Sequence, residues 1–188
     1  VLLIAFALAW NEFLGAGGAP IGIDLEGHGR AEELAADIDL SRTVGWFTAK
    51  YPAALSVGDL SWAQVSGGDS ALGLVVKSVK EQLRGLPDPL SYGLLRYLNP
   101  EVALPHSDSA IGFNYLGRLG AGATEASEDI WTISHEGLSW TSASSTVPMP
   151  MAHTVELNAG ILESSVESGP RLQAVWTWAP SLVDAIQV

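Results

Sequence analysis

The chain has 188 residues, no Cys and a formal net charge of −12 at pH 7, and 47% of its residues are hydrophobic. This length suits one medium domain or one lobe of a larger one, and the apolar fraction indicates a folded core rather than a disordered acidic tail. Without Cys there is no disulfide or Cys-ligated metal, and the acidic charge excludes nucleic acid as an expected partner. The composition is compatible with the cytoplasm, which is the location we expect.

An uncharged apolar run opens the chain at residues 1–10. A bilayer span needs about 20 such residues and a signal peptide needs a basic start, so the run predicts a buried helix that ends near Gly15. At the other end, Ser181 has the character of an N-cap from which a helix begins. We therefore expect a single lobe over residues 1–188, cut inside a helix at its start and just after a helix begins at its end, with no membrane contact.

Alternating apolar residues predict a strand over 20–26 whose buried face carries Ile21, Ile23 and Leu25. A short helix is expected over 30–36. Two short strands follow at 43–47 and 51–57, separated by a turn near Lys50, Tyr51 and Pro52, and a loop covers 58–68.

The clearest helix follows Asp69 or Ser70 and ends before Pro87 and Pro89. Its apolar residues recur at the spacing of one helix face, which predicts burial of that face. These apolar residues are Leu72, Val75, Val76, Val79 and Leu83. A second, shorter helix is expected over 90–98.

The second half of the chain predicts mainly strands. One covers 109–116 and another lies near 130–135, with loops over 117–128 and 137–150. A hairpin joins strands at 153–161 and 172–178 through a turn at Gly169 and Pro170. The pattern is that of an α+β fold with an antiparallel component and no internal repeat.

A first candidate site lies in residues 24–30 (DLEGHGR). If the strand continues, Asp24, Glu26 and His28 share one face at about 7 Å intervals, and Gly27 and Gly29 let another chain or a substrate approach the backbone. A carboxylate and an imidazole there form an acid/base pair. The alternatives are a solvated strand end or an ion pair between Glu26 and Arg30. A metal site on Asp24, Glu26 and His28 is disfavoured, because three ligands on one strand rarely converge.

The second candidate is the segment 113–115 (FNY). Asn114 and Tyr115 can donate hydrogen bonds to an oxyanion, but as neighbours on a strand they point to opposite faces unless a bulge or a strand end intervenes. The alternative is a structural role, with Tyr115 packed against Phe113 and Asn114 bonded to nearby backbone.

Three of the nine basic residues, Lys77, Lys80 and Arg84, follow one helix face. They form either a docking surface for an anionic partner or an ordinary solvated face. The chain has no GxxxxGKS/T, GxSxG or HExxH motif. These motifs mark P-loop nucleotide-binding proteins, hydrolases with a nucleophile elbow and zinc metalloproteases, so the sequence gives no support for those three classes.

Five strings then carry a resemblance to a known family. They occur at 24–30 (DLEGHGR), 41–52 (SRTVGWFTAKYP), 79–87 (VKEQLRGLP), 92–97 (YGLLRY) and 113–118 (FNYLGR). In this order and spacing they resemble the C-terminal half of an epimerization domain of a nonribosomal peptide synthetase, a member of the condensation-domain superfamily. The resemblance is strong over 24–118 and looser outside it. It implies a chloramphenicol-acetyltransferase-like lobe, a mixed sheet with flanking helices, that is half of a two-lobed domain.

The resemblance implies an epimerase, an isomerase of secondary metabolite biosynthesis. Such domains invert the α-carbon of an aminoacyl or peptidyl thioester held on the 4′-phosphopantetheine arm of a carrier domain. Glu26 corresponds to the acid/base glutamate of the family, and Asn114 and Tyr115 correspond to residues that line its tunnel; His28 and Arg30 are expected to support Glu26. The resemblance implies no metal and no cofactor bound by the chain itself.

The expected partners are a carrier domain, docked on Lys77, Lys80 and Arg84, and the N-terminal lobe with its HHxxxDG histidine. That motif is absent from this chain, so we expect the isolated chain to be inactive. The glycine-rich KGxGYG of many members is here replaced by residues 89–93 (PLSYG). Two alternatives stay open, a lobe of a peptide-bond-forming condensation domain and a non-catalytic carrier-docking lobe.

Overall fold

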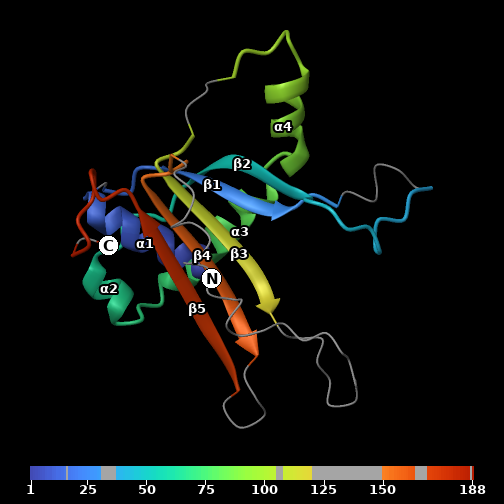
Figure 1. Cartoon of the computed structure of the whole chain (residues 1–188). Coiled ribbons are helices and arrows are strands. Elements are labelled where there is room, and N and C mark those ends of the chain that lie inside the picture. The colour runs from blue at the N-terminus through green and yellow to red at the C-terminus, as the bar shows by residue number, and fades with distance from the viewer. Residues whose placement is uncertain (16, 31–36, 105–107, 120–149, 164–168, 187) are drawn as a thin grey trace. The chain divides into compact units, whose positions relative to one another are not determined.

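The computed structural model describes residues 1–15, 17–30, 37–104, 108–119, 150–163, 169–186 and 188 (Figure 1). Two compact units divide the chain, one over Val1–Phe113 and one over Asn114–Val188. The hydrogen-bonded strands follow the order β2-β1-β3-β4-β5, and β3 starts in the first unit and continues in the second. The elements in chain order are α1 (Leu2–Leu14), β1 (Ile21–His28), β2 (Thr48–Leu55), α2 (Trp62–Ser66), α3 (Leu72–Arg84), α4 (Pro89–Leu98), β3 (Ile111–Leu119), β4 (Val155–Glu163) and β5 (Pro170–Trp178).

The first helix confirms the expectation for the apolar start of the chain. α1 ends at Gly15, whose φ of 59° is left-handed and whose N–H bonds to the carbonyls of Asn11 and Glu12. Glycine takes this conformation without a steric penalty, so it stops the helix where the sequence predicts. Phe6 is buried and stacks on Phe113, with 6.0 Å between the ring centroids. Among the described residues, no helix is both long and apolar enough to cross a membrane.

The core of the first unit lies on one face of β1. Ile21, Ile23 and Leu25 are all buried, as their alternation predicts. β1 pairs antiparallel with β2, with Ile23 opposite Ala53 and Ile21 opposite Leu55. The buried valines of α3, Val75 and Val79, belong to the same core.

Of the two short strands predicted at 43–47 and 51–57, the second overlaps β2, whereas the first strand and the turn near residues 50–52 are wrong. β2 is a single strand that runs through Lys50, Tyr51 and Pro52, and residues 43–47 lie outside it. β2 is an edge strand, and Pro is tolerated there because its missing N–H can face away from the ladder. A proline therefore does not mark a turn at this position.

Helix α2 lies inside the segment predicted to be a loop. Its N-cap Ser61 and Gln64 form a reciprocal capping box, a start signal that is readable in the sequence. The predicted helix after Asp69 is confirmed as α3, with the Ala71 N–H bonded to Asp69 Oδ1 at 2.8 Å. Gln82 fixes α3 to the end of β2, since its side chain bonds to both the N–H and the carbonyl of Ser56.

Helix α4 confirms the shorter predicted helix and packs along the edge strand β2. Asp88 is its N-cap and accepts a hydrogen bond from the Leu90 N–H at 2.8 Å. Pro89 occupies the first turn, where its missing N–H has no intrahelical partner to lose.

The connection between β1 and β2 is held by Gly29 and Arg30. The Gly29 N–H bonds to the Phe47 carbonyl, and the Arg30 guanidinium bonds to the carbonyls of Leu40 and Thr43. The same guanidinium lies 4.3 Å from the centre of the Phe47 ring. Arg30 thus fixes residues 40–47. Of the helix predicted over 30–36, residues 31–36 lie outside the described residues.

The second unit is built on the hairpin that the sequence predicts. β4 and β5 pair antiparallel from Val155 opposite Trp178 to Glu163 opposite Pro170. Val155, Leu157 and Ala159 are buried on one face of β4. The strand predicted near 130–135 lies outside the described residues. Of the loops predicted over 117–128 and 137–150, residues 120–128 and 137–149 also lie outside them, and residues 117–119 belong to β3 instead of a loop.

The helix predicted to begin at Ser181 is wrong. The described residues 180–186 form turns and a bend, and the N–H groups of Leu182 and Val183 both bond to the Ala179 carbonyl. Val183 is buried and anchors this turn. A good N-cap residue followed by a single turn does not commit the chain to a helix, because nucleation alone is unfavourable.

We expect Val79→Ala to lower the free energy of unfolding by about 1–3 kcal/mol, because it opens a cavity at a side chain with no exposed surface. Val76, which the sequence pattern places on the buried face, is 37% exposed, so that part of the prediction is wrong. Val76→Ala on the same helix is therefore the matched control and should change stability by less than about 0.5 kcal/mol. Urea unfolding of both variants measures the difference. Equal losses would contradict the assigned core face of α3.

We expect Gly29→Ala to destabilise the chain by about 1–3 kcal/mol through steric conflict. A Cβ at position 29 would lie 2.5 Å from the Phe47 carbonyl oxygen, whereas a Cβ at Gly27 would meet nothing within 4 Å. Gly27→Ala is therefore the control from the same string. Thermal unfolding of the two variants tests this difference. An unchanged unfolding midpoint for Gly29→Ala would show that the Phe47 carbonyl does not contact the backbone at Gly29.

Candidate functional site

The candidate site is centred on the carboxyl-terminal end of β1. The strand continues to His28, so Asp24, Glu26 and His28 occupy alternate positions of one face, as predicted. Burial decreases along this row: Asp24 is buried, Glu26 is half-buried and His28 is exposed. Glu26 is therefore partly sheltered and still accessible, which suits an acid/base group.

Asp24 is a fixed structural charge. Its Oδ1 accepts a hydrogen bond from Ser109 Oγ at 2.8 Å, and its Oδ2 lies 3.6 Å from Lys50 Nζ. The side chain of Asp24 is only 5% exposed. A buried carboxylate needs such partners, because an uncompensated charge there is strongly destabilising.

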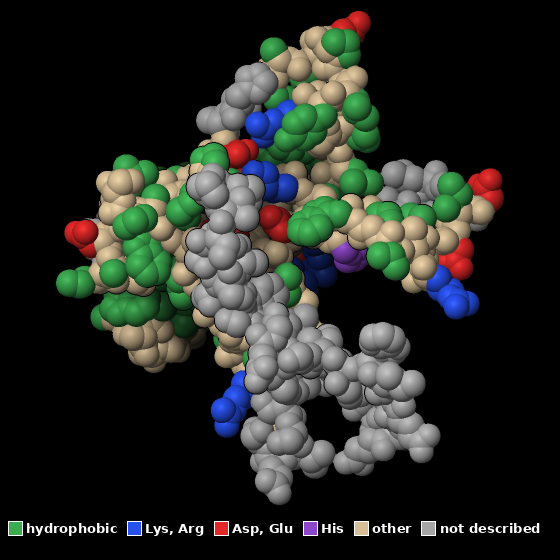
Figure 2. Space-filling view, viewed as in Figure 1, with side chains coloured by type: hydrophobic (Ala, Val, Ile, Leu, Met, Phe, Trp, Pro, Cys, Tyr) green, Lys and Arg blue, Asp and Glu red, His purple; other side chains and the backbone are tan. Residues whose placement is uncertain are grey.

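Lys50 connects Asp24 to a longer chain of charges. Its ammonium lies 3.3 Å from Asp108 Oδ1, which in turn lies 3.2 Å from Arg96 Nη1. Arg96 Nη1 also donates a hydrogen bond to the Tyr92 hydroxyl oxygen at 2.8 Å. We call Asp24, Lys50, Asp108 and Arg96 the charge network. It links β1, β2, α4 and the segment before β3, and Figure 2 shows acidic and basic side chains gathered between α4 and the β1–β2 pair.

The charge network changes the acidity of its own members. Burial on its own would raise the pKa of the Asp108 carboxyl, but hydrogen bonds and positive charges from Arg96 and Lys50 hold that pKa below its ordinary value. The hydrogen bond to Asp108, and then that to Tyr92, raises the pKa of Arg96. Both groups therefore stay charged at neutral pH.

The strand register places Lys50 directly opposite Glu26. In the antiparallel β1–β2 pair, Glu26 faces Lys50, Gly27 faces Ala49 and His28 faces Thr48. Directly opposed residues of such a pair project from the same side of the sheet. Lys50, one of the two cations of the charge network, therefore shares a sheet face with Glu26.

A hollow of about 310 Å³ lies along the β2 residues that face Glu26 and its neighbours. Its β2 wall consists of Thr48, Ala49 and Lys50, and α4 with Pro89 supplies the other wall. A second hollow of about 180 Å³ is lined by Tyr51 and Pro52 of β2 together with residues of α4 and of the segment before it. Burial raises the pKa of Tyr51. The sequence analysis did not anticipate either hollow, because both depend on α4 packing against β2.

Asn114 and Tyr115 are described with the second unit, where they are its first two residues. They are consecutive in β3, and Asn114 is half-buried while Tyr115 is exposed. Gly117 has a φ of 78°, which interrupts regular strand geometry two residues further on. Glu26 belongs to the first unit.

The basic residues of α3 are all exposed, as a docking surface or a solvated face requires. Arg84 pairs with Glu81 at 2.7 Å, and both side chains are more than half exposed. Such an exposed pair contributes little to stability. Lys77 and Lys80 lie on the same helix and are exposed as well.

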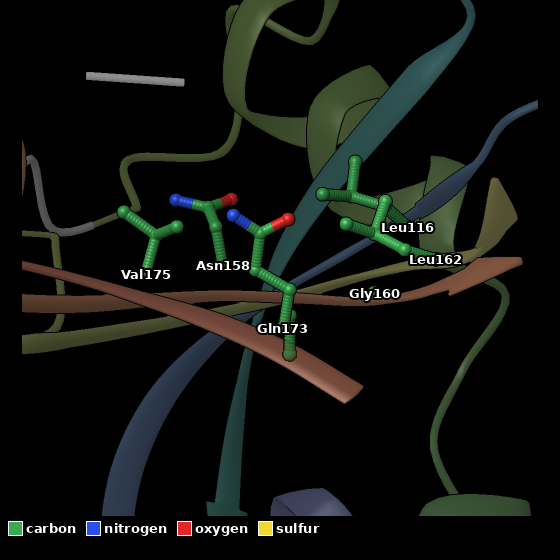
Figure 3. Close-up of a pocket in the computed structure, with 7 residues that line it drawn as sticks. Leu116, Asn158, Gly160, Leu162, Gln173 and Val175 are labelled. Carbon is green, nitrogen blue, oxygen red and sulfur yellow. The ribbon is translucent and has the colours of Figure 1, made fainter. Parts of the chain in front are cut away.

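The second unit holds a buried histidine that the sequence analysis did not single out as a site. His153 Nδ1 lies 3.3 Å from Glu156 Oε2, and Asn158 Nδ2 donates to Glu156 Oε1 at 2.7 Å. Asn158 and Gln173 line a hollow of only about 10 Å³, with their side-chain amides next to one another (Figure 3). That volume holds at most one water molecule. Among the described residues, no group of three His, Asp or Glu side chains is arranged to hold a metal ion.

The chain is similar in sequence to several peptide synthases. No family model matches the chain. It is 44% identical over 120 residues to surfactin synthase subunit 2 of Bacillus subtilis (strain 168), and 45% identical over 123 residues to chondramide synthase cmdD of Chondromyces crocatus. The matches cover 63% and 64% of this chain but 3% of each relative, so the chain spans a small part of those proteins.

A solved structure extends the match over almost the whole chain. The crystal structure of the epimerization domain from the third module of tyrocidine synthetase B aligns with a TM-score of 0.61 and 27% identity, over 95% of this chain and 35% of that one. It confirms the predicted α+β fold, a mixed sheet with flanking helices as in a chloramphenicol-acetyltransferase-like lobe. The comparisons together confirm the resemblance that the strings predict: this chain resembles part of an epimerization domain, a condensation-type domain of the nonribosomal peptide synthetases.

Proposed function

We propose that the chain is the C-terminal half of an epimerization domain that inverts the α-carbon of an aminoacyl or peptidyl thioester. The observation that carries this proposal is the position of Glu26. It is a half-buried carboxylate at the glycine-flanked end of β1, opposite Lys50, whose strand lines a hollow of about 310 Å³. The similarity to a solved epimerization domain supports the same assignment.

The chemistry requires a base next to the α-proton of the thioester. In the proposed reaction Glu26 removes or returns that proton on one face of the α-carbon, and the electron pair moves into the thioester carbonyl as an enolate. Hydrogen-bond donors must stabilise the enolate oxygen. By the family resemblance we assign Asn114 and Tyr115 this role, with His28 as a support for Glu26.

The second face of the α-carbon needs another proton carrier. We assign it to the histidine of an N-terminal lobe that contains HHxxxDG, the expected partner of this chain. The substrate is delivered on the 4′-phosphopantetheine arm of a carrier domain, and the chain itself needs no bound cofactor. The alternative of a peptide-bond-forming condensation domain is separated by its product, since that enzyme forms an amide and leaves the D/L ratio unchanged.

We expect Glu26→Gln, in the full domain with its N-terminal lobe, to lower α-proton exchange by at least about 100-fold, because the carboxylate is lost while the shape is kept. Deuterium wash-in to the carrier-bound thioester measures the exchange, and a binding titration with the carrier domain should stay unchanged. Glu101→Gln, at an exposed site, is the control. Normal wash-in with Glu26→Gln would refute the proposed base.

We expect Lys77→Glu combined with Lys80→Glu to weaken carrier binding, because carrier domains tend to be acidic and the two lysines lie exposed on α3. The loss should appear mainly in the association rate and should shrink as salt is added. Stopped-flow binding of the carrier domain measures this rate. Arg171→Glu, an exposed charge reversal on β5, is the control, and an equal effect of that variant would reject a specific docking face.

A further inference from the structure

We propose that Lys50 tunes the protonation of Glu26, and that Asp24 and Asp108 limit how strongly it does so. This inference rests on the proposed function, because it concerns the group that we assign as the base. It assigns a positioning and tuning role to three residues outside the carboxylate itself.

The strand register carries the first step of the argument. Glu26 and Lys50 are directly opposed in the antiparallel β1–β2 pair. Opposed residues have Cβ atoms about 4.5–5.5 Å apart and project from the same face. The Lys50 side chain is 30% exposed, so its charge is only partly screened by water.

The charge network carries the second step. The Lys50 ammonium lies 3.6 Å from Asp24 Oδ2 and 3.3 Å from Asp108 Oδ1, so two carboxylates hold it. Asp24 is also two residues before Glu26 on the same strand face, about 7 Å away along the strand. Glu26 therefore has a cation opposite it on β2 and an anion beside it on β1.

Other charged and titratable groups also lie on the elements around Glu26. His28 follows Glu26 on β1, and Arg96, Tyr92 and Tyr97 belong to α4, which packs on β2. Arg96 is paired with Asp108 and lies against the rings of both tyrosines. The first-unit part of β3, residues 111–113, carries no titratable side chain, while Tyr115 and Arg118 lie on its second-unit part.

The physical consequence is a base of intermediate strength. A nearby cation stabilises the carboxylate form of Glu26 and lowers its proton affinity, and a nearby anion does the opposite. If Lys50 interacted with Glu26 alone, it would make Glu26 a weaker base. If Lys50 were removed, Glu26 would stay protonated over a wider pH range. Sharing Lys50 with Asp24 and Asp108 keeps Glu26 between these two limits.

The test is the pH dependence of deuterium wash-in by the full domain, followed separately from the L and the D thioester. Both substrates are needed because Glu26 is the base in only one direction if a second group serves the other face. In that direction the rate falls at low pH as Glu26 becomes protonated, and the midpoint of this fall reports Glu26.

Two variants are expected to move that midpoint in opposite directions. Lys50→Met removes the cation, so the midpoint should move to higher pH by about half a unit to one unit. Asp24→Asn removes the neighbouring anion and releases Lys50 toward Glu26, so the midpoint should move to lower pH by a similar amount. Asp108→Asn also releases Lys50 and should move it in the same direction as Asp24→Asn; its side chain is 28% exposed, so this variant keeps the test valid if Asp24→Asn does not fold.

The control variants make the same changes in charge at exposed residues outside the charge network. Arg171→Met and Asp59→Asn alter exposed residues and should leave the midpoint where it is. Lys50→Arg keeps the cation and should restore the wild-type midpoint. Midpoints that stay fixed in the Lys50 and aspartate variants, or that all move in one direction, overturn the inference. If Glu26→Gln itself leaves wash-in intact, the proposed function fails instead, so the two failures are distinct.

Discussion

The pairing of the buried Asp24 carboxylate with Lys50 is the interaction on which the candidate site depends. A carboxylate that is 5% exposed requires a cation and hydrogen-bond donors, and Lys50 and Ser109 supply them from two other segments. Meeting this requirement fixes β2 beside β1, and Asp108 and Arg96 extend the link to α4. The hollow lies where α4 packs against the edge strand β2, and Lys50 of this link forms part of its wall.

Much of the fold could be predicted from the sequence because most elements follow simple periodic patterns. α1, α3 and the β4–β5 hairpin each have a continuous apolar face, and Gly15 marks the end of α1. The errors come from single residues interpreted without their surroundings. Pro52 was interpreted as part of a turn but occupies an edge strand, and Ser181 has an N-cap side chain but begins only one turn.

The candidate site could be predicted only in part, for a different physical reason. Glu26 stands out in the sequence because Gly27 and Gly29 follow it and because its strand alternates. The charge network was missed because Lys50, Asp108 and Arg96 are ordinary charged residues that are far from Asp24 in the sequence. Only strand register and helix packing bring them together, and no local pattern encodes either. The short helix α2 is a milder case, since its capping box was readable but its length of 5 residues leaves no periodicity.

The string at residues 24–30 combines scaffold and chemistry, which explains why it is specific. Asp24 anchors the strand, Gly29 lets Phe47 close on the backbone, and Arg30 fixes residues 40–47 through two carbonyls and an aromatic ring. These roles constrain the local fold whether or not a reaction occurs. Glu26 has a different proposed role, because its half-buried carboxylate lies directly opposite Lys50, the one cation that β2 places on its face. The proposed epimerase assignment therefore rests on this carboxylate and not on the anchoring residues around it.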